Sequence, residues 1–140
     1  MDKRYVIDTN VVFEGLTKKG GASDYIVRAW LGGLFRPMLS NALAYEYADV
    51  LSRKLSARRW EIIHPTLSVM IACAEFMPIR FTWRPASPDP GDDHLIDLGM
   101  NAGAAVVTFN VRDFSAAHHS LGLTVWTPVE FVTMLARSYP

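Results

Sequence analysis

The hydrophobic residues of this chain fall into short apolar runs that alternate with longer stretches of helical periodicity. Five of the runs are brief and mostly apolar, which predicts strands buried within a sheet. These runs are residues 4–8, 36–39, 78–81, 104–108 and 123–126.

Five longer stretches are predicted to be helices, most of them from apolar residues spaced three and four positions apart. Ser40 is placed to cap the second of them. Thr127, Pro128 and Glu130 form a capping box with proline at the first helical position, which predicts the start of the last. The predicted helices span residues 23–34, 40–55, 66–76, 92–102 and 128–137.

The order of these elements predicts an α/β fold, because strands and helices alternate along the chain. A length of 140 residues, half of them apolar, fits a single domain over residues 1–140. Residues 83–91 hold three prolines and a glycine, which predicts a loop. We do not interpret that loop as a domain boundary, since each half of the chain is too small for a good core.

Asp8 ends the first predicted strand. In open α/β sheets the carboxyl ends of the strands border the ligand crevice, so this position suits a functional acid. Asp8 is also a common kind of turn residue that bonds nearby backbone amides.

Glu46 and Asp49 lie on the helix predicted for residues 40–55. Asp49 is four residues before Arg53, which predicts an exposed ion pair. Glu46 instead flanks the apolar stripe that includes Leu43 and Val50, so it needs a partner if it is partly buried. A metal cation or a basic side chain would be a suitable partner for this carboxylate.

Three aspartates cluster where the helix over residues 92–102 is expected to begin. Acids are common at helix N-termini, and Asp89 fits an N-cap followed by Pro90. Asp92 shares the face of the inward-pointing apolar residues of this helix, and Asp93 lies one face over. We therefore favour Asp92 as the functional acid and keep Asp93 as its substitute.

Thr108, Asn110 and Asp113 follow the buried strand over residues 104–108. They mark a second strand carboxyl end with polar residues just beyond it. Carboxylates gathered 4–5 Å apart repel one another by about 3–4 kcal/mol per pair at an effective dielectric of about 20. Such a cluster requires protons or cations, and oxygen ligands without a thiolate select Mg²⁺ or Mn²⁺.

Composition narrows the function classes further. The formal net charge of +0 excludes a global basic field that would attract nucleic acid or acidic membranes. The single cysteine, Cys73, suits a reducing compartment, and its apolar neighbours predict a buried position. No apolar leader or membrane-length segment is visible, so we expect a soluble cytoplasmic protein.

Taken in order, these residues resemble the PIN-domain nucleases. The resemblance begins with VIDTN at residues 6–10, continues through Ser40 and Glu46, and includes Asp92 in the sequence DPGDDHLI at residues 89–96. It ends with VTFNVRDF at residues 107–114 and the helix start at Thr127. Each piece alone is weakly specific, but the ordered set extends over nearly the whole chain.

The resemblance implies a Rossmann-like α/β/α sandwich with a mostly parallel sheet and an endoribonuclease that uses Mg²⁺ or Mn²⁺. It implies that Asp8, Glu46 and Asp92 bind metal. Asp113 or Asn110 completes that set, and Asp113 has more weight because Asn110 is neutral. The residues that the resemblance gives a supporting role, orienting the ligands or the substrate, are Asn10, Ser40, Asp93 and Thr108.

A short single-domain protein of this kind is most similar to the VapC-type toxins of toxin–antitoxin pairs. The implied partners are an RNA substrate, a small antitoxin protein and a second copy of the chain in a homodimer, with no membrane. Candidate contacts to RNA phosphates are basic residues that equally suit solvated helix ends. They are Lys18, Lys19, Arg53, Lys54, Arg58, Arg59 and Arg112.

Other interpretations stay open on the sequence. One is a PIN-fold module with weakened catalysis that binds RNA or an antitoxin, which Asn110 in place of an acid favours. Another is a different Mg²⁺-dependent phosphohydrolase. Trp60, Trp83 and Arg84 are candidates for stacking on unpaired bases, although buried or interface aromatic residues are commoner.

Overall fold

A five-stranded parallel sheet forms the centre of this computed structural model, which describes residues 3–83 and 89–138. The strands are ordered β3-β2-β1-β4-β5, and every neighbouring pair is parallel. This confirms the predicted α/β class and its parallel sheet. The strands are β1 (Arg4–Ile7), β2 (Arg36–Leu39), β3 (Glu75–Phe76), β4 (Ala105–Val107) and β5 (Val125–Trp126).

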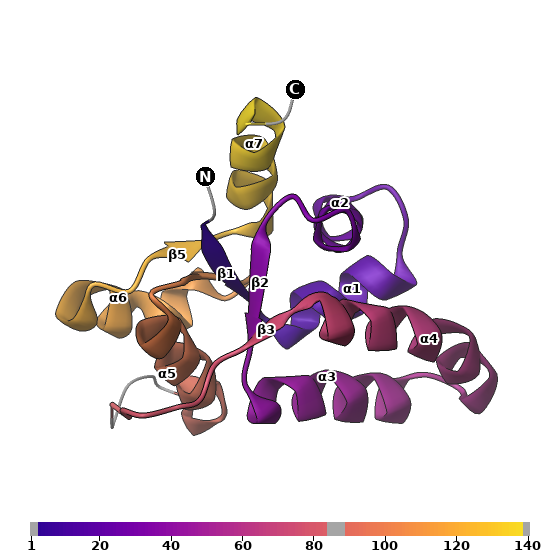
Figure 1. The fold of residues 1–140 in the computed structure, drawn as a ribbon, viewed down its shortest axis with the longest axis horizontal. Helices are drawn as coiled ribbons and strands as arrows, with labels where there is room; N and C mark the ends of the chain where they lie inside the picture. The colour runs from indigo at the N-terminus through magenta and orange to yellow at the C-terminus, as the bar shows by residue number, and fades with distance from the viewer. Residues whose placement is uncertain (1–2, 84–88, 139–140) are drawn as a thin grey trace.

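Helices cover both faces of the sheet, as Figure 1 shows. The chain moves outward from β1 to β2 and β3 through α1, α2, α3 and α4, then returns to the other side of β1 for β4 and β5, with α5 and α6 on the opposite face. The helices are α1 (Thr9–Thr17), α2 (Ala22–Leu31), α3 (Asn41–Lys54), α4 (Ala57–Cys73), α5 (Asp93–Ala102), α6 (Ser115–Leu121) and α7 (Pro128–Ser138). Two 3₁₀ turns, η1 (Pro90–Asp92) and η2 (Val111–Phe114), precede α5 and α6.

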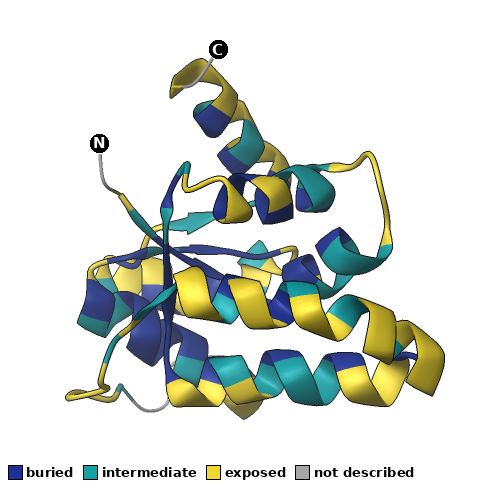
Figure 2. Cartoon of the chain, turned by 45° about the vertical axis from the view of Figure 1, so that its right-hand side comes forward, coloured by how far each residue is buried: buried dark blue, intermediate teal, exposed yellow. Residues whose placement is uncertain are grey.

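The core consists of the sheet and the inner faces of these helices, which are dark blue in Figure 2. Val6, Val106 and Val107 are completely buried in the two central strands, as expected for a parallel sheet covered on both faces. Within the described residues, every helix is too short or too polar to cross a lipid bilayer.

Several local predictions are confirmed by hydrogen bonds. The Ser40 hydroxyl accepts the backbone N–H of Leu43 at 3.1 Å and caps α3. At the start of α7 the Thr127 hydroxyl accepts the Glu130 N–H at 3.1 Å, and the Glu130 carboxylate accepts the Thr127 N–H at 2.8 Å. Both bonds of the capping box are therefore present.

The strand predicted over residues 78–81 is wrong. The edge strand β3 is Glu75–Phe76, and no strand follows it over residues 77–83. Pro78 has no backbone N–H to donate to a sheet hydrogen bond. The backbone of the residues after it is instead hydrogen-bonded to side chains of α5. The helix predicted over residues 66–76 begins earlier, at Ala57, where Ser56 caps it, and Pro65 lies inside it.

One further expectation is wrong, two helices were missed, and one loop is only partly described. Helices α1 and α6 were not predicted. Cys73 is exposed rather than buried, because it ends α4 on the side that faces away from the core. The loop expected over residues 83–91 falls partly on residues 84–88, which lie outside the described residues.

Candidate active site

The candidate active site lies between the carboxyl ends of β1 and β4. Here the strand order reverses, because the chain adds β2 and β3 on one side of β1 and then β4 and β5 on the other. This is the point at which open parallel sheets form a ligand crevice. Asp8 follows β1 directly, and its backbone N–H donates to the Val107 carbonyl of β4 at 2.9 Å. Its carboxylate accepts the Thr108 hydroxyl at 2.7 Å, so the two strand ends are joined through side chains as well. Asp8 is only 6% exposed.

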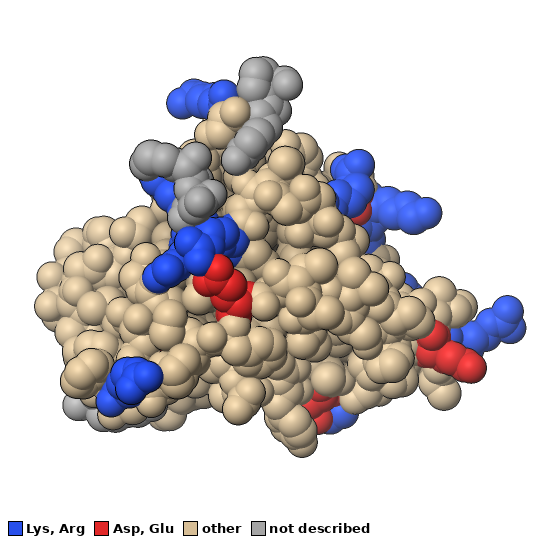
Figure 3. Space-filling model, in the orientation of Figure 1, with Lys and Arg blue, Asp and Glu red and all other residues tan. Residues whose placement is uncertain are grey.

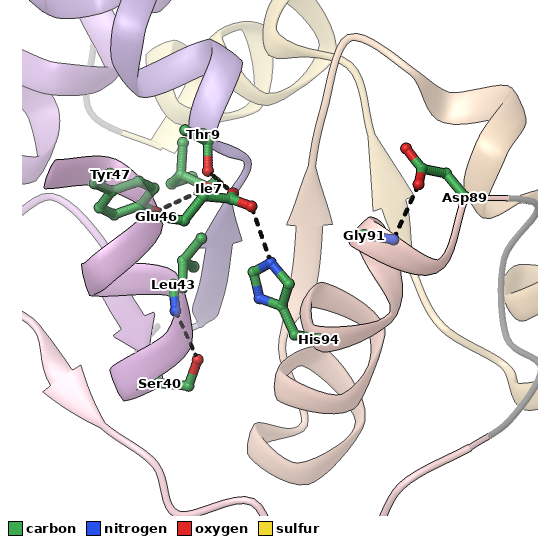
Figure 4. A network of polar contacts seen from close by, with 9 residues as sticks. All are labelled: Ile7, Thr9, Ser40, Leu43, Glu46, Tyr47, Asp89, Gly91 and His94. Atoms are coloured by element: carbon green, nitrogen blue, oxygen red, sulfur yellow. Dashed lines mark hydrogen bonds and ion pairs between the residues drawn. The ribbon is translucent and has the colours of Figure 1, made fainter. Parts of the chain in front are cut away.

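Glu46 reaches the same point from α3. Both of its carboxylate oxygens are engaged: the Thr9 hydroxyl donates to one, and the other lies 3.2 Å from Nε2 of His94. Figure 4 shows Glu46 of α3 pointing across to His94 of α5. The Glu46 side chain is 34% exposed, so one edge of the carboxylate remains open to solvent.

Helix α3 is attached directly to the end of β1. Its buried side chains include Leu43 and Tyr47, which lie on either side of Glu46 in the sequence. The Tyr47 hydroxyl donates to the carbonyl of Ile7, the residue before Asp8. This contact explains how a helix 40 residues away along the chain brings Glu46 next to Asp8.

Asp92 and Asp89 come from the turn η1 that precedes α5. Asp89 caps the turn by accepting the Gly91 N–H at 2.9 Å (Figure 4). Asp92 is half-buried at the start of α5. Asp93 is buried, 6% exposed, and does not border the cavity. The structure therefore favours Asp92 over Asp93 as the acid that faces the site.

The carboxylates surround one small cavity of about 230 Å³. Asn110 and Asp113, from the segment after β4, are part of its lining. The cavity is lined by Asp8, Thr9, Asn10, Glu46, Val50, Arg53, Lys54, Asp89, Asp92, Asn110 and Asp113. All of the predicted metal-binding residues meet here, although they come from segments more than 100 residues apart.

Electrostatics confirm that these acids affect one another. Burial and then the charges of Asp8, Asp89, Asp113 and Glu46 raise the pKa of Asp92 to about 6. Burial also raises the pKa of Asp8, against the lowering effect of its hydrogen bond from Thr108. The site therefore holds more negative charge than it can easily stabilise near neutral pH.

His94 partly offsets that charge. Its hydrogen bond with Glu46 raises the pKa of the imidazole, and the same bond lowers the pKa of the Glu46 carboxyl. Nδ1 of His94 is buried without a hydrogen-bond partner among the described residues. Among the described residues, the imidazole therefore forms its side-chain hydrogen bond through Nε2, to Glu46.

The donor set fits a hard divalent cation. Carboxylate and amide oxygens without a thiolate suit Mg²⁺ or Mn²⁺, and a cation would relieve the repulsion that raises the pKa of Asp92. Within residues 3–83 and 89–138, no three His, Cys, Asp or Glu side chains already form a ligand group. The hydrogen bonds explain this, because Asp8 is turned toward Thr108 and Glu46 toward Thr9 and His94.

The predicted supporting residues divide into two groups. Thr108 bonds Asp8, and its hydroxyl also accepts the Asn110 N–H at 3.0 Å, while Asn10 lines the cavity. Ser40 does not border the cavity and acts as the cap of α3.

Among the basic residues, Arg53 and Lys54 border the cavity from the end of α3. Arg53 also pairs with Asp49 at 3.1 Å, as the sequence predicted. The remaining candidates are exposed and do not line this cavity. They are Lys18, Lys19, Arg58, Arg59 and Arg112.

Three site residues were not predicted. Thr9 and His94 contact Glu46 from positions 37 and 48 residues away, and no local pattern indicates such pairs. Asp89 was interpreted only as a cap, a role that the structure confirms, but it also borders the cavity. The one available signal was its position three residues before Asp92.

Comparison with protein families identifies the chain. The family model described as PIN domain matches residues 4–112, from β1 to the start of η2. The chain belongs to the PIN-domain family. The match includes Asp8, Glu46 and Asp92 of this PIN domain and ends one residue before Asp113.

Solved structures share the fold of this PIN domain at low sequence identity. The crystal structure of VapBC2 from Rickettsia felis, bound to a DNA fragment from their promoter, contains a chain with a TM-score of 0.66 and 14% identity. The alignment covers 89% of this chain and 98% of that one.

Two further solved structures share the fold of this chain. FitAB bound to an IR36 DNA fragment matches with a TM-score of 0.61 and 13% identity, covering 89% of this chain and 94% of that one. FitAcB from Neisseria gonorrhoeae matches with a TM-score of 0.61 and 13% identity, covering 89% and 98%. A comparison with curated proteins found no match.

Proposed function

We propose that this PIN domain is a metal-dependent endoribonuclease and the toxin of a toxin–antitoxin pair in the cytoplasm. The observation that supports the proposal most strongly is that four acids line one cavity between β1 and β4, where the strand order reverses. These acids are Asp8, Glu46, Asp92 and Asp113. Acids from four separate elements repel one another there, and a divalent cation is the partner that their chemistry calls for.

In this proposal Asp8, Glu46 and Asp92 hold Mg²⁺ or Mn²⁺, and Asp113 with Asn110 completes the shell. When bound, such an ion lowers the pKa of a water and stabilises negative charge on the phosphate and the leaving oxygen. Thr108 holds the Asp8 carboxylate in orientation through its hydroxyl. The Glu46 carboxylate is held by Thr9 and His94, and its solvent-exposed edge would face the ion.

Arg53 and Lys54 are placed to hold the phosphodiester. They border the same cavity as the carboxylates, from the last turn of α3. Cations at this position would offset the acids that otherwise repel a phosphate. In this proposal Arg53 and Lys54 orient the RNA strand, while the acids hold the metal ion.

The toxin assignment is supported by the fold and by the kind of complexes in which it occurs. VapBC2 and FitAB were each solved bound to a DNA fragment. For this chain we propose a small antitoxin that covers the acidic cavity, and a homodimer of the free protein. Light scattering of the purified protein, alone and with the antitoxin, would measure both assemblies.

The test uses purified protein without antitoxin, incubated with structured RNA in Mg²⁺, Mn²⁺ or EDTA. We expect metal-dependent cleavage by the wild type and none by Asp8→Asn. Asp24→Asn is the matched control, because it makes the same change on a carboxylate that pairs with Arg28 at 3.4 Å on α2, and neither residue lines the cavity. DNA of the same sequence tests whether the substrate is restricted to RNA.

A protein that binds Mn²⁺ in calorimetry but cleaves neither nucleic acid would contradict the nuclease proposal. A folded protein that binds no metal would favour the binding module. Asn110 in the cavity in place of another acid favours that alternative. Turnover of a phosphomonoester by the wild type, lost in Asp8→Asn, would instead indicate a phosphohydrolase.

A further inference from the structure

Helix α4 lies at the surface but lacks the charged outer face that surface helices usually have. Residues 62–74 contain no Lys, Arg, Asp or Glu. On the inner side of the helix, Leu67 and Met70 are buried in the core, at 2% and 0% exposure. On the outer side, Ile62 and Val69 are 67% and 52% exposed. A helix that is apolar all round is normally covered on all sides, so the outer face of α4 is suited to a partner.

The exposed apolar residues of α4 are regularly spaced. Four of them follow one another at intervals of three, four and three positions: Ile62, Pro65, Val69 and Ala72. We call these four residues the α4 stripe. Their spacing is that of the a and d positions along which two helices pack together. The stripe spans only about 15 Å of helix, so it can pair with another helix only as part of the folded domain.

Other exposed apolar side chains extend the surface around the α4 stripe. Phe76 of β3 and Ile79 are 48% and 39% exposed, and they continue the alternating intervals of four and three residues. Helix α2 lies alongside α4, where Nε1 of Trp30 donates to the Met70 carbonyl at 2.8 Å, and the next residue, Leu31, is 39% exposed. A specific interface needs about 800 Å² on each partner, more than one helix face supplies. These neighbours provide additional apolar area.

The distribution of charge suits a second copy of the chain as the partner. Figure 3 has the orientation of Figure 1, and uncharged surface extends over α4 while charged side chains lie toward the edges of this face. An exposed apolar face marks an interaction site. A face without charge is complementary to itself, because neither copy brings a charge that the other would have to bury.

Charges at the two ends of α4 favour an antiparallel pair of helices. Arg58 and Arg59 are exposed in the first turn, and Glu75 follows the helix with its side chain 44% exposed. Arg36 bonds only Oε1 of that carboxylate. In a parallel pair the arginines of the two copies would meet and repel one another. In an antiparallel pair centred on Leu67, Arg59 lies level with Glu75 of the second copy, because each is eight residues from the centre.

We propose that the α4 stripe is the homodimer interface of this protein, with the α4 helices of two copies packed antiparallel about a twofold axis at the level of Leu67. This inference rests on the proposed homodimer of the free protein and locates its interface. None of residues 57–73, all of which the structure describes, borders the acidic cavity. The residues that line the cavity are therefore outside the helix pair.

The experiment measures the mass of the purified protein without antitoxin, by light scattering over a dilution series. Ile62→Glu places a charge on the α4 stripe, and glutamate is a good helix former, so the fold should be retained. Val129→Glu is the matched control, because Val129 is also β-branched and 67% exposed but lies on α7. Circular dichroism checks that each variant is folded, and Mn²⁺ titration checks the acidic cavity.

We expect the wild type and Val129→Glu to form dimers with the same dissociation constant. Ile62→Glu should raise that constant about tenfold or more, because each dimer would bury two unpaired carboxylates. Val69→Glu should have a larger effect, since Val69 is closer to the proposed axis and the new charges of the two copies approach each other. Mn²⁺ affinity should be the same in all four proteins.

Cross-linking tests the direction of the two helices. Ser68 is exposed and one residue from the proposed axis, so its two copies lie about 3 Å apart along the helix. Cys73, the one cysteine of the chain, is exposed and six residues from the axis, which separates its two copies by about 18 Å. A short bismaleimide should therefore cross-link Ser68→Cys in a Cys73→Ser background and leave the wild type uncross-linked.

Four results would overturn this arrangement. A wild type that is monomeric throughout the dilution series would reject the dimer. A dimer that both glutamate variants of the stripe leave intact would place the homodimer interface elsewhere. An intact dimer with loss of the antitoxin complex in Ile62→Glu would assign the stripe to the antitoxin. Cross-linking of the wild type through Cys73 would reject the antiparallel pair.

RNA cleavage keeps this inference separate from the nuclease proposal. A dimer that depends on the α4 stripe, in a protein that cleaves no RNA, would support the interface and reject the nuclease. Metal-dependent cleavage by a wild type that remains monomeric would support the nuclease and reject the interface.

Discussion

At the level of single residues, the charged form of the Asp92 carboxylate is poorly stabilised by its surroundings. Burial and four neighbouring acids raise its pKa to about 6, so the folded protein disfavours the charged form that a metal needs. Because the pKa is higher than in the unfolded chain, stability is lost as the pH rises from about 4 to about 6.

We therefore expect Asp92→Asn to be more stable than the wild type above about pH 6. The gain should be about 1 kcal/mol, after discounting for a side chain that is partly exposed. Urea unfolding in EDTA at acidic and neutral pH would measure it. An equal difference between the two proteins at every pH would contradict the electrostatic cause. The same variant should lose metal binding, a trade of function against stability.

The contribution of the His94–Glu46 pair to stability depends on pH in two directions. The raised pKa of His94 means that its contribution is present below its ordinary value of 6.5 and is lost as the pH rises through the raised value. The lowered pKa of Glu46 means that its contribution is present above 4.5 and is lost as the pH falls. The pair stabilises the fold most between these two values.

His94→Gln keeps a hydrogen-bond donor but removes the charge. We expect it to destabilise the metal-free protein by about 1 kcal/mol near pH 5.5 and by less near pH 8.5. Urea unfolding at the two pH values would test this. His118→Gln provides the control, because this histidine bonds the Leu123 carbonyl at 2.8 Å and forms no ion pair with an acid among residues 3–83 and 89–138. A loss that is the same at both pH values would indicate packing instead.

At the level of elements, one buried hydrogen bond joins α3 to the end of β1. Tyr47 is completely buried, and its hydroxyl bonds the Ile7 carbonyl beside Asp8. We expect Tyr47→Phe to cost about 1–2 kcal/mol of unfolding free energy and to weaken metal binding through Glu46. Tyr45→Phe on the same helix is the control, since Tyr45 is 73% exposed. Equal metal affinity in both variants would contradict the role of this bond.

The elements also show how far sequence reasoning reaches. Helix α3, the capping box of α7 and the central strands follow local rules, because caps and apolar periodicity are local. Helix α1 begins directly after β1, and its first-turn residues Val11 and Val12 are both buried, so it has the apolar pattern of a continuing strand. The edge strand β3 is only two residues long, which leaves no period to detect.

The residues of the site show the same difference between what local sequence indicates and what only the tertiary structure shows. Asp8 and Glu46 were singled out because an acid at a strand end suits a crevice and an acid beside an apolar stripe needs a partner. Asp92 and Asp113 lie at helix starts, where acids are common, and they entered the metal-binding set through the ordered resemblance to the PIN-domain nucleases. The contacts of Glu46 with Thr9 and His94 were not predicted, because they arise from the packing of α3 against α1 and α5. Only the tertiary structure brings those residues together.

At the level of the whole molecule, a cation should stabilise the fold as well as the site. A ligand that binds only the folded state at about 100 times its dissociation constant adds about 2.7 kcal/mol. We expect saturating Mn²⁺ to raise the thermal midpoint of the wild type by several degrees, and that of Asp8→Asn hardly at all. Differential scanning calorimetry would measure it, and equal shifts in both proteins would place the ion elsewhere.

The hydrogen bond between Asp8 and Thr108 joins residues 100 positions apart. One wall of the cavity is therefore made near the start of translation, and the opposite wall is added only when β4 and η2 have been synthesised. At about 5–20 residues per second, several seconds separate the two events. Until then the nascent chain lacks Thr108, Asn110 and Asp113 and cannot close its acidic cavity, so any activity of this site begins only after most of the chain has been synthesised.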